Sequence, residues 1–499
     1  MTFKIYYFLP FVFILMMFDT LDGQSNDQFL SFADSIHNHW HYVKEEKLQH
    51  KFFREKDITT LLKSYESLSM IHFDTLGFSV EGRPIHIIKF GQGDIPVAMW
   101  TQMHGNEPTA TMAVMDMLRF FADDDPFLSE WKSNIYQRIS LYIIPMLNPD
   151  GAEVFKRRNA LDIDLNRDAL RLESPESQLL KMVIDSIRPR FGFNLHDQSD
   201  YYTAGDVDIP ATIAFLAPAY DEDKSINDSR ANAMRLIVQL NEIVQQYLPG
   251  AVGRFSDTFE PRAFGDNIQK WGTSTILIES GAYKGDLHKQ TQRQLHFTML
   301  LAALQSIASK SYLIEGLRPY EDIPYNNRRG HDLIVRNLDL IVSGDTIRLD
   351  VAYQKDEVRI EQPPHYFQRF FISDMGDLST MYGFIEVDAE GWTYSSGKLL
   401  KDKWKSLLDM NIAAIIQQGY SHVLVKRLPP EHKIQGLPLQ FLLHERDFNN
   451  DIKMGLNPGI ILTHDGDNRR VFINNGQFLN LAEDDIQHLE KLTIADLFD

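Results

Sequence analysis

Short apolar runs alternate with amphipathic stretches from about residue 50 to about residue 310. This alternation predicts an α/β domain, in which helices pack against a sheet. The amphipathic stretches at 108–121, 229–247 and 287–307 carry apolar residues at helical spacing. The apolar runs predict five strands, at residues 85–90, 96–103, 139–145, 191–195 and 273–279.

The pattern changes beyond a polar segment with two prolines, residues 315–330, which we expect to be a linker. Short alternating runs then follow one another, separated by turn sequences such as Ser-Gly-Asp at 343–345. One helical stretch, at about 404–417, interrupts them. We therefore predict an α/β domain over residues 24–315 and a β-rich domain over residues 330–499, whose role the sequence does not indicate.

Residues 1–23 have the pattern of a secretory signal peptide. Lys4 precedes an apolar run from 6 to 18, and the chain turns polar at Asp19. Thirteen apolar residues are few for a bilayer span. A buried N-terminal helix or an uncleaved anchor is the alternative, and Pro10 counts against a packed helix. The expectation is export to the periplasm or the extracellular space, with no membrane span after signal removal.

Charge and cysteine content exclude several classes of function. The formal net charge of −19 argues against nucleic acid as a partner, because such binding requires basic patches. The chain has no cysteine, which excludes disulfides, cysteine nucleophiles and thiolate-held metals. Any metal site must therefore use nitrogen and oxygen ligands, for which 17 histidines and 69 carboxylates are available.

Two predicted strands end in histidine motifs. His104 and Glu107 follow the run at 96–103, and His196 follows the run at 191–195. The carboxyl edge of an α/β sheet is where ligands bind, and imidazole and carboxylate groups suit zinc. Taken singly, each motif has an ordinary alternative, namely helix capping for Glu107 and a core or surface position for His196.

Two further groups accompany these motifs. Glu279 closes an apolar strand, where a carboxylate could be a general base or merely an ion-paired or capping residue. The segment 156–167 combines cationic side chains with Asn166, which could hold a carboxylate or polarise a carbonyl. Its alternative is a solvated basic surface.

Together these motifs resemble the zinc carboxypeptidase (metallocarboxypeptidase) family, and the chain resembles an exported bacterial member of it. The order HGNEPT, NPDG, RRNA…DLNRD, NLHDQ and a strand ending in Glu279 is that of the family, and residues 77–85 resemble its early signature. The resemblance covers about residues 50–310. It implies a mixed sheet with helices on both faces. It also implies one zinc per chain and a peptide substrate with a free C-terminal carboxylate.

The resemblance also assigns roles to individual residues. The implied zinc ligands are His104, Glu107 and His196, and Glu279 is the implied general acid/base. Asp164 would orient a zinc histidine. The residues implied to contact the substrate are Asn166 and Arg167, on its terminal carboxylate, and Arg157, on the scissile carbonyl, with the adjacent Arg158 as the alternative.

Some features of the family have no counterpart that the sequence identifies. Tyr201, Tyr202 and Tyr283 are candidates for the mobile tyrosine, and residues 255–272 do not align securely, which leaves side-chain preference open. Two other functions stay open. One is a zinc amidase or deacylase acting on peptidoglycan stem peptides or acyl-amino acids. The other is an inactive binding protein that acts through its C-terminal region.

Overall fold

The computed structural model describes residues 26–65, 70–123, 126–361, 364–434, 436–464, 470–481 and 488–498. The predicted signal peptide, residues 1–23, lies outside them. The chain divides into two compact units, the first ending at Arg328 and the second beginning at Arg329. Among the described helices, none combines the length and the apolar composition that a membrane crossing requires.

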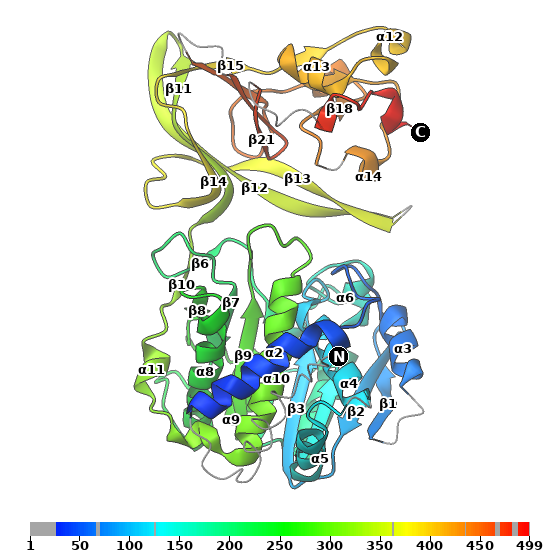
Figure 1. Cartoon of the computed structure of the whole chain (residues 1–499), viewed down its shortest axis with the longest axis vertical. Helices are drawn as coiled ribbons and strands as arrows, with labels where there is room; N and C mark the ends of the chain where they lie inside the picture. The colour runs from blue at the N-terminus through cyan, green and yellow to red at the C-terminus, as the bar shows by residue number, and fades with distance from the viewer. Residues whose placement is uncertain are drawn as a thin grey trace, which may run out of the picture. The chain divides into compact units, whose positions relative to one another are not determined.

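The first unit is built on a mixed eight-stranded sheet (Figure 1), as predicted. Its strand order is β1-β2-β4-β3-β5-β9-β7-β8. The pairs at the centre (β4-β3-β5-β9) are parallel, as is the edge pair β7-β8, whereas β1-β2, β2-β4 and β9-β7 are antiparallel. The five predicted strands are β2 to β5 and β9. The strands are β1 Ile71–Phe78, β2 Pro84–Phe90, β3 Ile95–Thr101, β4 Ile139–Ile144, β5 Phe191–Asp197, β7 Ile213–Leu216, β8 Val252–Arg254 and β9 Ser274–Ser280.

Helices cover both faces of this sheet, because its central strands are apolar on both sides. On one face Val97 and Met99 of β3 pack in a core with α2, α4, α8 and α10. On the other face Ala98 and Trp100 pack with α7 and α9. The helices are α2 Asn26–Val43, α3 Glu55–Ser64, α4 Thr109–Ala122, α5 Ser129–Arg138, α6 Pro149–Glu153, α7 Pro175–Ile187, α8 Asp228–Tyr247, α9 Phe264–Lys270 and α10 Gln290–Ser309.

Part of the segment 315–330, expected to be a linker, is folded against the first unit. It contains the short helix α11 (Arg318–Glu321) and the strand β10 (Asn326–Arg328), which pairs with β6 (Tyr202–Ala204). Tyr320 is buried, and its hydroxyl accepts a hydrogen bond from the backbone N–H of Ala217 at 3.0 Å. This buried aromatic ring explains why a proline-containing, polar stretch is ordered.

The second unit is rich in strands, as predicted. It contains a sheet ordered β13-β12-β11-β14, an antiparallel sheet β15-β19-β20-β21 and a parallel sheet β16-β17-β18. The helices α12 (Trp404–Leu408) and α13 (Ile412–Gln417) form the expected helical interruption. The strands are β11 Gly330–Val342, β12 Asp345–Glu361, β13 Pro364–Gly376, β14 Tyr382–Asp388, β15 Trp392–Ser396, β16 Lys398–Leu400, β17 Tyr420–Leu424, β18 Gln440–Leu442, β19 Ile460–His464, β20 Arg470–Asn474 and β21 Gln477–Asn480.

Candidate metal and catalytic site

The turn between β3 and α4 places His104 and Glu107 together at the carboxyl edge of the sheet. Both side chains are buried, and the backbone N–H of Glu107 donates to the carbonyl of His104 at 3.1 Å. Gly105 makes this turn possible, because a Cβ there would lie 2.0 Å from the carbonyl carbon of Gly151. Only glycine allows the two backbones to approach so closely.

His196 completes a three-residue cluster from the neighbouring strand β5. The Nδ1 atoms of His104 and His196 lie 2.7 Å from Oε1 and Oε2 of Glu107, respectively. One ligand atom from each of these residues can be chosen so that all three lie within 4.8 Å of one another. The structure therefore brings together the three residues expected to bind metal.

The chemistry of this donor set fits a zinc ion. Nε2 of His104 lies 3.0 Å from Oδ1 of Asp164. Because a carboxylate only accepts hydrogen bonds, Nε2 carries a hydrogen and donates a hydrogen bond to Asp164. Nδ1 of His104 then faces a Glu107 oxygen at 2.7 Å, so this nitrogen and this oxygen are placed to share either a proton or a metal ion. Two imidazole nitrogens and a carboxylate form a ligand set that suits zinc and leaves a position open.

Electrostatics at the cluster point the same way. Burial would raise the pKa of Glu107, but the two histidines outweigh it and hold this pKa well below its usual range. Burial would likewise lower the pKa of His104, but Glu107 and Asp164 outweigh it and raise this pKa. The pocket thus favours positive charge between these groups.

Asp164 connects the cluster to the basic segment that follows it. Its Oδ2 accepts a hydrogen bond from Nε of Arg157 at 3.1 Å, and its Oδ1 accepts from the backbone N–H of Asn166 at 3.0 Å. Burial would raise the pKa of Asp164, but the hydrogen bond with His104 and the charge of Arg157 hold it well below its usual range. Asp164 is therefore ionised and positions three neighbours at once.

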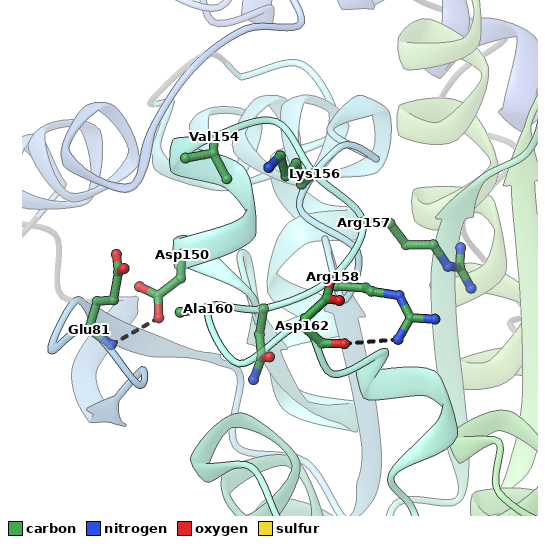
Figure 2. Close-up of a pocket in the computed structure, with 9 residues that line it drawn as sticks. Glu81, Asp150, Val154, Lys156, Arg157, Arg158, Ala160 and Asp162 are labelled. Carbon is green, nitrogen blue, oxygen red and sulfur yellow. Dashed lines mark hydrogen bonds between the residues drawn. The ribbon is translucent and has the colours of Figure 1, made fainter. Parts of the chain in front are cut away.

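The structure distinguishes Arg157 from Arg158. The Arg157 guanidinium lies 3.2 Å from Oε1 of Glu107 and 3.0 Å from Nδ1 of His104. Arg158 instead donates to the carbonyl of Asp162 at 2.9 Å (Figure 2). Arg157, and not Arg158, therefore lies beside His104 and Glu107.

Glu279 lies beside His196, because these residues are register partners on β9 and β5. Its Oε2 is buried and has no hydrogen-bond partner among the residues that the structure describes. Burial raises the pKa of Glu279 to about 8, with Glu107 and Asp197 adding to the shift and His196 opposing it. A buried carboxyl group with a raised pKa, next to the His104–Glu107–His196 cluster, can accept and return a proton.

Asn166 and Arg167 lie on the short helix Leu165–Arg167 at the rim of the site. Oδ1 of Asn166 accepts the backbone N–H of Phe264 at 3.0 Å, which fixes this amide against the start of α9. Nε of Arg167 lies 3.4 Å from Oε2 of Glu260, and the Arg167 side chain is 38% exposed. Its guanidinium is therefore open to solvent and to ligands.

Some neighbours of the site were not anticipated from the sequence. Glu260 pairs with Arg167 across 93 positions of chain, and no local pattern marks such a contact. Asp197 follows His196 directly, but its Oδ2 accepts a hydrogen bond from Thr109 Oγ1 at 2.6 Å. Burial raises the pKa of Asp197 to about 6. Of the three tyrosine candidates, Tyr201 is buried, Tyr202 lies on β6, and Tyr283 is 41% exposed after β9.

Comparisons with known proteins identify related sequences. Residues 56–193 match the family model described as zinc carboxypeptidase. Carboxypeptidase SOL1 of Arabidopsis thaliana is 28% identical over 201 residues, which are 34% of this chain and 39% of that protein. Carboxypeptidase 2 of Trichophyton rubrum is 28% identical over 109 residues, which are 21% of this chain and 19% of that protein. The chain thus aligns with well under half the length of these relatives.

Solved structures were also matched. A metallo-carboxypeptidase from Burkholderia cenocepacia matches with a TM-score of 0.43 and 19% identity, over 52% of this chain and 70% of that chain. A metallo-carboxypeptidase from Pseudomonas aeruginosa, in complex with (2-guanidinoethylmercapto)succinic acid, has a TM-score of 0.40 and 18% identity, over 52% and 70% of the respective chains.

Proposed function

We propose that this chain, a relative of the zinc carboxypeptidases by its residues 56–193, is a zinc-dependent metallocarboxypeptidase that removes C-terminal residues from peptides. The observation that carries this proposal is the convergence of His104, Glu107 and His196, with Glu279 beside them on the next strand. When bound there, zinc supplies a Lewis acid that polarises a carbonyl and makes water more acidic.

Glu279 is the group that moves the proton. Its buried Oε2 takes a proton from the attacking water and returns it to the nitrogen of the leaving amine. Burial raises the pKa of Glu279 above its usual range, which favours a group that can both take up and return a proton.

Arg157 stabilises the negative charge that develops on the carbonyl oxygen. Its side chain is 44% exposed although its guanidinium touches Glu107 and Asp164, so it can contact a substrate without leaving the site. A fixed cation at this place favours the transition state more than the ground state.

Asn166 and Arg167 select the chain end. A guanidinium and an amide side by side can pair with the free carboxylate of a peptide, which places the last peptide bond at the reacting groups. The Arg167 fork is shared with Glu260, so the bound carboxylate would compete with that side chain for Arg167.

A substrate screen on the purified chain tests the proposal. Peptides with free C-termini should release single amino acids, the same peptides with amidated C-termini should resist, and a chelator should stop the reaction. Muropeptides and acyl-amino acids serve as comparison substrates. Two results would contradict carboxypeptidase activity. One is turnover of muropeptides or acyl-amino acids alone, and the other is cleavage of amidated peptides as fast as of peptides with free C-termini.

We also propose that the enzyme acts outside the cytoplasm, in the periplasm or the extracellular space. The support is the apolar run at residues 6–18, which has the length of a signal-peptide core. N-terminal sequencing of the mature protein recovered from culture fractions tests this, because a protein that keeps its first 20 residues inside the cell would contradict export.

A further inference from the structure

A buried lysine lies where the two strands that carry His196 and Glu279 end. This residue, Lys289, immediately precedes α10, and its side chain is 8% exposed. Its Nζ donates a hydrogen bond to the carbonyl of Ser280 at 3.1 Å and lies 3.1 Å from Oδ1 of Asp200. Because Ser280 follows Glu279 on β9, Lys289 holds the peptide directly after the proposed general base.

The same ammonium group reaches the end of β5. Asp197 follows His196 directly and is the register partner of Ser280 on β9. Oδ2 of Asp197 lies 4.0 Å from Nζ of Lys289 and accepts a hydrogen bond from Thr109 Oγ1 at 2.6 Å. Thr109 is in turn the first residue of α4. One buried cation is therefore connected to the ends of β5 and β9 and to the start of α4.

A second side chain of α10 holds the next peptide. Gln292 is fully buried, and its Nε2 donates to the carbonyl of Gly281 at 2.8 Å. The backbones approach closely here, since a Cβ on Gly281 would lie 2.1 Å from the carbonyl oxygen of Ala211. Two consecutive carbonyls after Glu279 thus accept hydrogen bonds from side chains at the start of α10.

The fold imposes the position of Lys289. Its φ angle is +54°, a left-handed conformation that residues other than glycine seldom adopt and that persists only where the surrounding structure demands it. Its carbonyl accepts the backbone N–H of Arg293 at 2.9 Å, the first hydrogen bonds of a helix that is buried along nearly its whole length. A packed helix therefore presents the ammonium group to the strand ends.

The contacts of Lys289 are of two kinds. Asp197 and Asp200 provide the negative charge that a buried ammonium group requires. The hydrogen bond to Ser280 instead fixes the backbone that carries Glu279. A general base must lie within hydrogen-bond reach of the proton that it accepts, so the backbone that carries it must stay in place during the reaction.

We propose that Lys289 is a positioning residue, which holds the ends of β9 and β5 and so keeps the Glu279 carboxylate beside the metal cluster. This inference rests on the proposed carboxypeptidase function. Lys289 acts through the Ser280 peptide and not by contact with the substrate. Loss of its side chain should therefore slow the chemical step and leave zinc binding and substrate binding nearly unchanged.

The test compares the wild-type holoprotein with Lys289→Met, Gln292→Leu and the double variant. Lys132→Met is the matched control, because Lys132 is also a buried lysine of the first unit. It donates to the carbonyl of Asp123 at 2.9 Å and lies over the ring of Phe120. Should Lys289→Met fail to fold, Lys289→Gln takes its place with the same expectation.

Four quantities are measured on each protein. The constants kcat and KM are determined with one peptide that has a free C-terminus. Zinc per chain and melting temperature report on the metal site and on the fold. Hydrogen exchange of the backbone amides at residues 277–283 follows the end of β9 directly, without any need for turnover.

In Lys289→Met, kcat should fall by about 10- to 100-fold, as it does when a reacting group is displaced by about 1 Å. KM should change by less than about threefold, zinc should stay at one per chain, and exchange at 277–283 should be faster. Gln292→Leu should show a smaller loss of kcat, and the double variant a larger loss than either. Lys132→Met should keep kcat and the exchange at 277–283, whatever its melting temperature.

Three outcomes would overturn the proposal. They are a kcat in Lys289→Met within about twofold of wild type, a rise in KM or a loss of zinc that accounts for the whole effect, and an equal fall of kcat in Lys132→Met. Should the wild type cleave no peptide, the carboxypeptidase function fails instead. Hydrogen exchange then decides the contact by itself, because equal exchange at 277–283 in Lys289→Met and in wild type would rule it out.

Discussion

Asp116 and Arg293 form an ion pair whose two side chains are both fully buried, and it joins α4 to α10. Nε of Arg293 lies 2.7 Å from Oδ2 of Asp116, and the same carboxylate accepts from Trp40 Nε1 and from the backbone N–H of Glu45. Arg293 also donates to the carbonyls of Glu45 and Leu48. The pair therefore links the segment that contains Trp40, Glu45 and Leu48 to α4 and α10.

Breaking this pair should destabilise the first unit. Arg293→Met leaves a buried carboxylate without its cation, which costs about 3–5 kcal/mol in the free energy of unfolding. The variant with both Arg293→Met and Asp116→Leu should recover part of that loss, because no charge is left unpaired. Urea unfolding of the full chain measures both. A loss below about 1 kcal/mol in the single variant would show that water reaches the carboxylate.

His196→Ala should abolish stoichiometric zinc binding, because two ligands remain where a stable site needs three. Zinc per chain is measured by mass spectrometry after dialysis. His72→Ala is the control, since His72 is exposed on β1 and should leave the zinc content at one per chain. Full zinc content in His196→Ala would show that the ligand set is different.

Asp164→Asn should weaken zinc binding by about 10- to 100-fold without abolishing it, as loss of an orienting carboxylate does. The neutral amide no longer makes the His104 ring a better ligand. Competition with a chelator of known affinity gives the ratio. Asp162→Asn, two residues away on the exposed loop, should bind zinc as the wild type does.

Glu279→Gln should keep zinc and fold while turnover falls by about 10²–10⁴-fold or more, because the amide cannot accept the proton. Its melting temperature should be unchanged or higher, since a buried group with a pKa raised to about 8 is replaced by a neutral one. The capping or ion-pair alternative forecasts the reverse, a less stable protein with near-normal kcat. Both quantities are measured on one sample.

The contribution of His296 to the stability of the first unit should fall as the pH drops from about 6.5 to about 4. His296 is fully buried, and burial lowers its pKa to about 4, so the unfolded chain binds a proton that the folded chain refuses over this window. The expected contribution is on the order of 3 kcal/mol. The difference in unfolding free energy between wild type and His296→Leu should therefore change by about this amount between pH 6.5 and pH 4. The corresponding difference for His72→Leu should not change.

Long apolar strands were predictable from the sequence, and short ones were not. The strand β5 is buried along nearly its whole length, so its composition identifies it. The strands β7 and β8 have four and three residues, too few to show a period. The edge strand β1 mixes exposed and buried residues without strict alternation, which hides it from the same criterion.

The site was predictable where its residues follow strands, because parallel strands bring their carboxyl ends to one edge. This rule predicted that His104, Glu107, His196 and Glu279 lie close together at one edge of the sheet. Contacts between distant segments, such as Arg167 with Glu260, depend on the tertiary fold and leave no local signal. The sequence cannot distinguish the roles of the adjacent residues Arg157 and Arg158, because these roles depend on the direction of each side chain in the folded structure.

The two oxygens of Asp164 serve three different functions, since they contact His104, Arg157 and the backbone of Asn166. Under the proposed mechanism, metal retention, polarisation of the carbonyl and recognition of the chain end would therefore all depend on Asp164. Natural variation or laboratory selection cannot tune these properties separately by changing this residue. Variants with altered specificity that keep their activity should instead arise at positions that do not contact Asp164, such as Glu260.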